Sequence, residues 1–171
     1  RMDKATGEWV NFSDETGKEN KLCRVSGMDG GVLWLGYRDG TIVRHPEGTD
    51  RWERVRPPLS MTPEGPGSGE EARLRRSFHA TSFAFTDRYV LVGLKPGETV
   101  TLESAGGPSG LLVLDRDAGR WHLVESLLDE DDLAVTSICI DDGVLWLQTG
   151  MRNIVRWPLD DLAERLSAGS S

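Results

Sequence analysis

The chain has 171 residues, of which 37% are hydrophobic and 28% are charged, and its formal net charge is -8. This length and composition are typical of a globular domain with a sizeable core and not of a disordered segment. The acidic balance argues against a surface for nucleic acid or for an anionic membrane, because both need clustered Lys and Arg. No apolar run approaches the ~20 residues of a membrane-spanning helix. We therefore expect no nucleic-acid partner and no membrane span.

Four short apolar runs form the first predicted unit. They are rich in Val, Leu, Ile, Trp and Thr, and turn residues separate them, which is typical of strands. The turn Arg38-Asp39-Gly40 indicates a hairpin, because Gly adopts a positive φ at little cost. We predict an antiparallel meander with strands at residues 22–26, 32–37, 41–45 and 51–56.

Two further units follow the first. The second has predicted strands at residues 80–85, 89–94, 110–114 and 120–125. The third has predicted strands at residues 135–140, 144–149 and 154–157. A Pro- and Gly-rich insertion at 57–77 precedes the second unit and leads into a candidate short helix over 70–78, and another insertion covers 95–109. Loops of this length serve either binding or plain surface, and plain surface is the more common outcome.

The strand pattern ends at residue 157. Pro158 stands near the start of the next segment, and apolar residues then follow at helical spacing through residue 166. The sequence predicts a short helix there, with a tail of small residues at 167–171.

Two cysteines and the first residues bear on processing. Cys23 and Cys139 lie in apolar strand-like runs, where two buried free thiols are more typical than a disulfide. Arg1 precedes Met2, and no signal peptide is recognised. We expect that Arg1 is not a natural translation start, and the compartment stays undetermined.

Two sequence elements recur in fixed order, which marks a repeat protein. Val-Leu-Trp-Leu occurs at 32–35 and again at 144–147, and a diverged copy lies at 89–93. The second element is a turn followed by a Trp in an alternating run, and it recurs at Trp9, Trp52 and Trp121.

These units resemble the two-component-regulator propeller repeats and, more broadly, the quinoprotein-like and kelch-like β-propellers. The closest stretch is residues 32–44, where a strand ending in Trp34-Leu35-Gly36 leads through a Gly turn into an apolar strand ending in Arg44. The copy at 144–150 has Gln148 in place of the Gly. The middle copy has Leu91 in place of the Trp.

The resemblance implies an all-β fold of β-propeller blades, each a four-stranded antiparallel meander. About three blades, a partial propeller, would occupy residues 1–157, and a short helix with a flexible tail would occupy 158–171. Each meander is apolar on both faces, so that stacking the blades face to face supplies the core. We expect five tryptophans to fill the spaces between blades: Trp9, Trp34, Trp52, Trp121 and Trp146.

Three blades are fewer than the roughly 4–8 of a closed propeller. The sequence begins partway through a blade by this alignment, and its last blade has three strands. Two explanations stay open. The remaining blades belong to a longer polypeptide or to a second chain, or two copies combine as a homodimer into a six-bladed ring.

The motifs give little support for catalysis. The three His residues are scattered, no Cys-x-x-Cys or metal-ligand spacing occurs, and no nucleophile elbow or phosphate loop is present. The acidic run at 129–132 lacks the alternation of a calcium loop. We therefore predict no catalytic residues, no metal and no cofactor.

A basic cluster before a predicted innermost strand is the best candidate site. It offers positive charge to a small anionic ligand or a partner protein, and it consists of Arg73, Arg75, Arg76 and His79. The alternative is that these Arg side chains are solvated or pair with Glu70 and Glu71.

The predicted function is that of a non-catalytic module, a sensor or scaffold that binds a partner or ligand as part of a larger propeller. One alternative is a propeller enzyme whose active-site residues lie mostly on blades outside this chain. Another is a lectin-like propeller in which exposed Trp residues stack on carbohydrate.

Overall fold

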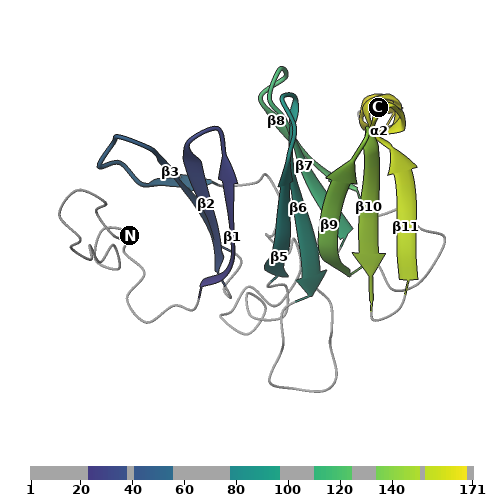
Figure 1. Cartoon of the computed structure of the whole chain (residues 1–171), viewed down its shortest axis with the longest axis horizontal. Helices are drawn as coiled ribbons and strands as arrows, with labels where there is room; N and C mark the ends of the chain where they lie inside the picture. The colour runs from purple at the N-terminus through teal and green to yellow at the C-terminus, as the bar shows by residue number, and fades with distance from the viewer. Residues whose placement is uncertain are drawn as a thin grey trace, which may run out of the picture.

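The computed structural model describes residues 23–37, 41–55, 78–96, 110–124, 134–150 and 153–168. Within these ranges the chain forms three antiparallel sheets and one short helix, which confirms the prediction of an all-β fold (Figure 1). No sheet closes on itself in the part of the chain described.

Each sheet is a simple up-and-down meander in chain order. The first sheet contains β1 (Cys23–Asp29), β2 (Val32–Tyr37), β3 (Ile42–Pro46) and β4 (Glu53–Val55). The second sheet contains β5 (Phe78–Phe85), β6 (Tyr89–Pro96), β7 (Gly110–Asp115) and β8 (Arg120–Val124). The third sheet contains β9 (Val135–Asp141), β10 (Val144–Thr149) and β11 (Asn153–Pro158).

The observed strands follow the predicted ones closely, with small shifts at their ends. The main difference is at β5, which begins at Phe78, so that the last residue of the candidate helix over 70–78 is a strand residue. The rest of that candidate helix lies outside the described residues, as do most of the insertion at 95–109 and the turn at 38–40.

The second sheet lies between the other two and packs on both of its faces. One face of β6, with Val90 and Val92, meets the first sheet around Trp34. Leu91, on the opposite face, meets the third sheet around Leu145 and Leu147. This double burial explains why β6 and β7 are continuous apolar runs, whereas strands with one solvated face alternate.

Two glycines let the neighbouring sheets approach closely. A Cβ at Gly36 would lie 2.7 Å from Cβ of Ala80 on β5. A Cβ at Gly93 would lie 3.0 Å from Val135 on β9, and closer still to Thr81 on the neighbouring β5. Neither distance leaves room for a side chain, so the Gly of the repeated motif is required where the next sheet crosses.

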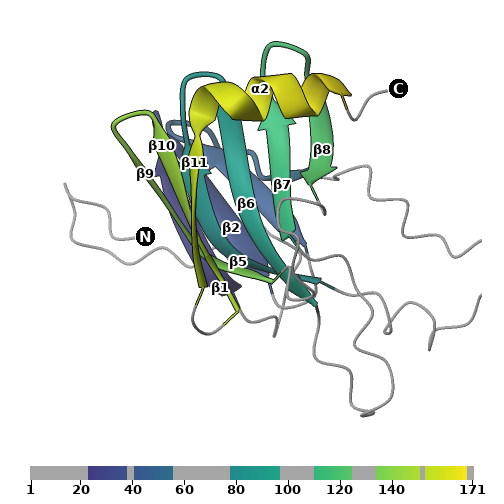
Figure 2. The same cartoon turned by 90° about the vertical axis from the view of Figure 1, so that its right-hand side faces the viewer.

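The helix α2 (Leu159–Ala168) takes the place in the chain where a fourth strand of the third sheet would follow. Figure 2 shows it lying across one end of the strands. Leu162 and Leu166 are buried in the core between the second and third sheets. Asp160 and Asp161 lie in the first turn, where negative charge complements the helix dipole. The predicted helix over 158–166 is therefore part of the core.

The tryptophans are placed unequally. Trp34 is 2% exposed and packs against Phe83 and Phe85 of the second sheet. Trp121 is half-buried in the same layer. Trp52 is half-buried beside His45, and Trp9 lies outside the described residues.

Trp146 differs from the expectation, because it is 39% exposed. Its face of the third sheet has no neighbour among the described residues, whereas the opposite face, with Leu145 and Leu147, is fully buried. Trp157, which was not among the five expected fillers, is buried in the core on that opposite face.

The cysteines are free, as predicted, but both are exposed and not buried. Cys139 is exposed because it shares the open face of the third sheet with Trp146, its partner in register. Partial burial of the Cys23 thiol raises its pKa, although backbone hydrogen bonds at Val25 and Gly36 lower it in part. Among the described residues, no helix has the length and hydropathy to span a bilayer.

Candidate functional site

The first strands of the three sheets, β1, β5 and β9, lie next to one another, and the later strands extend away from them (Figure 1). This places one edge of every sheet along a common line. Residues of consecutive sheets come together along this line, which makes it a candidate site.

Each first strand carries a β-bulge at the same position. In the first sheet the register shifts between Cys23 and Val25, and in the second it shifts between Ala80 and Ser82. In the third sheet Gln148 pairs with Ser137 while Thr149 pairs with Val135. The extra residues are Arg24, Thr81 and Thr136. Bulges redirect side chains and are common beside functional sites.

The two bulge threonines use their hydroxyl groups in different ways. Thr81 donates a hydrogen bond to the carbonyl of Val135, which joins the second sheet to the third. Thr136 donates to the carbonyls of Gln148 and Gly150 within its own sheet, at 3.2 and 3.4 Å. Thr81 therefore links two consecutive sheets, whereas Thr136 stabilises the third sheet alone.

The predicted basic cluster falls largely outside the described residues. Arg73, Arg75 and Arg76 all lie there, so their relation to one another stays a prediction. His79 lies on β5 beside the bulge, pairs in register with Lys95 of β6 and is 5% exposed. The structure therefore places one of the four residues, next to the line of first strands.

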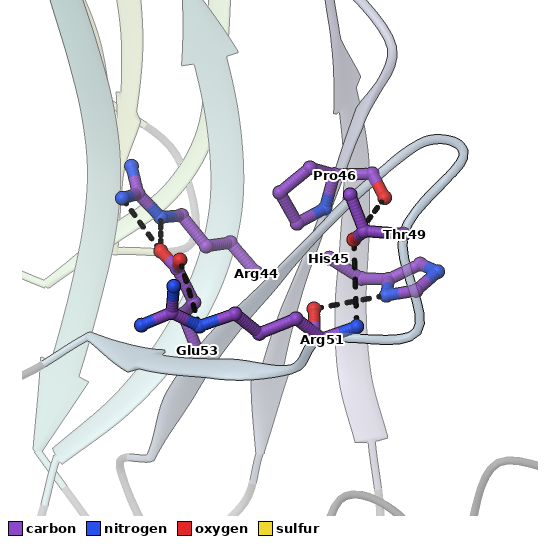
Figure 3. A network of polar contacts seen from close by, with 6 residues as sticks. All are labelled: Arg44, His45, Pro46, Thr49, Arg51 and Glu53. Carbon is purple, nitrogen blue, oxygen red and sulfur yellow. Dashed lines mark hydrogen bonds and ion pairs between the residues drawn. The ribbon is translucent and has the colours of Figure 1, made fainter.

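A polar network crosslinks the hairpin of β3 and β4 (Figure 3). The guanidinium of Arg44 holds Oε2 of Glu53 through both Nε and Nη2 at 2.7 Å, and Nε of Arg51 lies 3.5 Å from Oε1. The hydrogen bond from Arg44, together with its charge, lowers the pKa of Glu53. Both carboxylate oxygens are engaged, so Glu53 is a structural acceptor in this arrangement.

His45 belongs to the same hairpin and is 5% exposed. Its ring stacks on Trp52 with the ring centroids 4.5 Å apart. Nδ1 lies 3.2 Å from the carbonyl oxygen of Arg51 (Figure 3). Since a carbonyl only accepts, Nδ1 carries the proton in this contact. Thr49 closes the turn by donating to the Pro46 carbonyl at 2.9 Å.

A second network lies at the turns of the second sheet. Asp115 accepts hydrogen bonds from Arg88 at 3.0 Å and from the backbone N–H groups of Asp117 and Ala118 at 3.0 and 3.1 Å. Burial alone would raise the pKa of Asp115, but these hydrogen bonds outweigh it and hold the pKa below its ordinary value. Asp115 therefore stays ionised and fixes the turn.

One ion pair joins the first and second sheets. Nη2 of Arg116, after β7, lies 2.7 Å from Oδ2 of Asp29 at the end of β1. Both side chains are only partly exposed, so the pair is less screened than an ordinary surface pair. It fixes how the two sheets face each other.

No group of three or more His, Cys, Asp or Glu side chains is arranged to hold a metal ion among the described residues. The charged groups described above are engaged with one another. What stays accessible is the open face around Trp146 and the line of first strands.

Comparisons with known proteins add little. No family model matches the sequence, and no curated protein matches it. Among solved structures, the chain is similar to the computationally designed Ika4 protein, with a TM-score of 0.44 and 19% identity over 78% of this chain and 63% of that one. It is also similar to the computationally designed Ika8 protein, with a TM-score of 0.37 and 17% identity over 80% of this chain and 46% of that one. The chain thus spans less than two thirds of either protein, and neither similarity is high enough to assign a fold or a function.

The bulge residues were missed by sequence reasoning, although a signal exists. Thr-Ser followed by an alternating apolar run occurs at 81–85 and again at 136–140, as Thr-Ser-Phe-Ala-Phe and Thr-Ser-Ile-Cys-Ile. A search for repeats centred on the Trp motif does not find this Thr-Ser signal. In the first sheet the corresponding residues are Arg24-Val25, followed by Ser26, so that the signal is absent from one of the three repeats.

Proposed function

We propose that this chain is a non-catalytic β-propeller module that binds a partner or ligand, as a sensor or scaffold, and that it forms part of a larger propeller. The observation that carries the proposal is the shared register of the three hairpins. In each sheet the first strand carries a bulge at the same position, and the first strands of consecutive sheets lie side by side, β1 beside β5 and β5 beside β9. Repeated meanders that stack with their first strands together are the building plan of a propeller.

The stacking of the sheets also supports a structural role for the polar networks and the apolar residues described above. The polar networks around Glu53 and Asp115 stabilise individual turns. The apolar residues fill two layers between sheets. This leaves loops and open faces as the surfaces for recognition, which is how propellers with many different activities differ from one another.

The ligand site that we propose is the cluster of Arg73, Arg75, Arg76 and His79 for a small anion. His79 lies beside the line of first strands, and the three arginines precede it in the chain by three to six positions. Guanidinium groups bind phosphate and carboxylate through paired hydrogen bonds, which suits an anionic ligand.

Titration with inorganic phosphate tests this site. We expect chemical-shift changes in an NMR spectrum that concentrate on residues 78–82 and on Lys95, because these lie at the end of the cluster that the structure describes. The triple variant Arg73→Gln, Arg75→Gln, Arg76→Gln should lose the response, whereas Arg120→Gln, an exposed arginine on β8, should keep it. A response that survives in the triple variant, or none in the unmodified chain, would contradict the anionic site.

A further inference from the structure

The open face of the third sheet repeats a face that is covered elsewhere in the chain. Trp34 pairs in register with Arg44, and the guanidinium lies 5.9 Å from the ring centroid. Trp146 pairs in register with Arg156 in the same way, at 5.7 Å. Trp34 is covered by β5 and is 2% exposed, whereas Trp146 is 39% exposed. We call this surface, which also includes Gln148 and Ile154, the Trp146 face.

The surfaces that receive such a face are also repeated. In the second sheet Phe83 and Phe85 of β5 receive Trp34. Ile138 and Ile140 stand at the same register positions on β9 and pack in the core with Leu91. Each receiving surface therefore consists of two alternating residues of a first strand, supported by apolar residues of the next strand.

The first sheet has a receiving surface on which no other described sheet packs. By register, Ser26 and Met28 of β1 correspond to Phe83 and Phe85, and they pair with Leu35 and Leu33 of β2. Met28 is 62% exposed, which is unusual for a large apolar side chain. We call this surface of Ser26, Met28, Leu33 and Leu35 the Met28 face.

We propose that the Trp146 face docks on the Met28 face of a second copy of this chain. Both interfaces between the described sheets join the Trp-type face of one sheet, which carries Trp34 or Leu91 at the same register position, to the receiving face of the next. Among the described residues, each copy has one face of each kind without a neighbouring sheet. Two copies joined head to tail would use all four, and six sheets lie within the usual size of a propeller. This inference rests on the proposed function, and it assigns the missing blades to a homodimer mate.

A face-to-face pairing of two identical Trp146 faces has no counterpart between the described sheets, because both of those contacts join unlike faces. Head-to-tail docking instead sets the Trp146 face against the largely apolar Met28 face, as happens at both interfaces within the chain.

Two differences predict that the contact between two copies is weaker than the contacts between the sheets of one chain. Gln148 stands where Gly36 and Gly93 allow close approach, so that the incoming strand must stay further away at that end. Glu47 of the first sheet stands where Arg116 stands in the second, and it would face Asp141, the counterpart of Asp29. A reversible dimer follows from these differences.

Crosslinking tests the orientation of the two copies. Within the chain, a Cβ at Gly27 would lie 3.1 Å from Cβ of Phe83. The corresponding pair across the proposed contact is Cys139 of one copy and Ser26 of the other, near the Cβ separation of about 3.5–4.5 Å that a disulfide bridges. We expect the variant Cys23→Ala, Ser26→Cys to form a covalent dimer under mild oxidation. Adding Cys139→Ala should abolish it.

The control is Cys23→Ala alone, which should stay monomeric on a non-reducing gel. A covalent dimer of that control would mean that two Cys139 faces meet, and it would overturn the head-to-tail arrangement. Failure of the Ser26→Cys variant to crosslink at high protein concentration would overturn it too.

Molar mass in solution tests the same contact without new cysteines. We expect a concentration-dependent mass that rises toward twice the chain mass of 18.9 kDa. Trp146→Glu and Met28→Glu should each weaken association at least tenfold, whereas Arg120→Glu, on neither face, should not. Glu47→Arg should strengthen association, because it would place an arginine opposite Asp141 of the other copy, as Arg116 lies opposite Asp29 within the chain.

A monomer at every concentration, or an unchanged dimer in Trp146→Glu, would overturn this inference. Neither result would change the outcome expected in the phosphate titration, because the proposed ligand site can be tested in the monomer as well as in the dimer.

Discussion

At the scale of single residues, Trp34 and Trp146 occupy the same position in their sheets but differ in what covers them. Their register partners, Arg44 and Arg156, are also equivalent. Burial therefore depends on the next sheet and not on the local sequence, because Phe83 and Phe85 cover only Trp34. This is why sequence reasoning could find both tryptophans as one motif and still misplace Trp146.

The two tryptophans form a matched pair for measuring what the packing contributes. Trp34→Ala should lower the free energy of unfolding by about 3–5 kcal/mol, because a large buried side chain is removed and leaves a cavity. Trp146→Ala should cost about 1 kcal/mol or less, as is usual for exposed positions. Urea denaturation at a protein concentration low enough to keep the chain monomeric gives both values. Equal losses would show that the two faces are covered alike.

At the scale of elements, the strands and the helix were largely predictable, because their patterns are local. Alternation and turn residues located the strands of all three sheets, and the helical spacing after Pro158 located α2. Two features of the fold could not be predicted from local sequence patterns. The bulges at Thr81 and Thr136 depend on the pairing with the next strand. The packing of α2 into the core depends on the second and third sheets, whose Leu91 and Leu145 lie in the same cluster as Leu162.

The contribution of α2 can be measured by truncating one of its buried side chains. Leu162 is fully buried between the second and third sheets. Leu162→Ala should therefore lower the free energy of unfolding by about 2–5 kcal/mol. Glu164→Ala, an exposed position on the same helix, should change it by no more than about 0.5 kcal/mol. If thermal or urea unfolding gave both variants the same stability, the helix would not be part of the core.

At the scale of the whole molecule, three sheets stack in one direction. Each contact sets a Trp-type face against the first strand of the next sheet, and glycines at Gly36 and Gly93 allow the approach. The repeated Gly was visible in the sequence as part of a motif, but its reason appears only when Ala80 and Val135 are placed against it. The basic cluster could be named from the sequence, and its arrangement stays a prediction because Arg73, Arg75 and Arg76 lie outside the described residues.

The most direct test of this stacking is a set of nuclear Overhauser effects measured between sheets in one NMR sample. We predict cross-peaks from Gly27 Hα to the Phe85 ring, from Gly36 Hα to the Ala80 methyl group and from Gly93 Hα to the Val135 methyl groups, because each pair is in close contact. Cross-peaks within the β1–β2 and β5–β6 hairpins serve as the internal control. If the hairpin cross-peaks appeared and the three between sheets did not, the sheets would not stack in this order and the account would be contradicted.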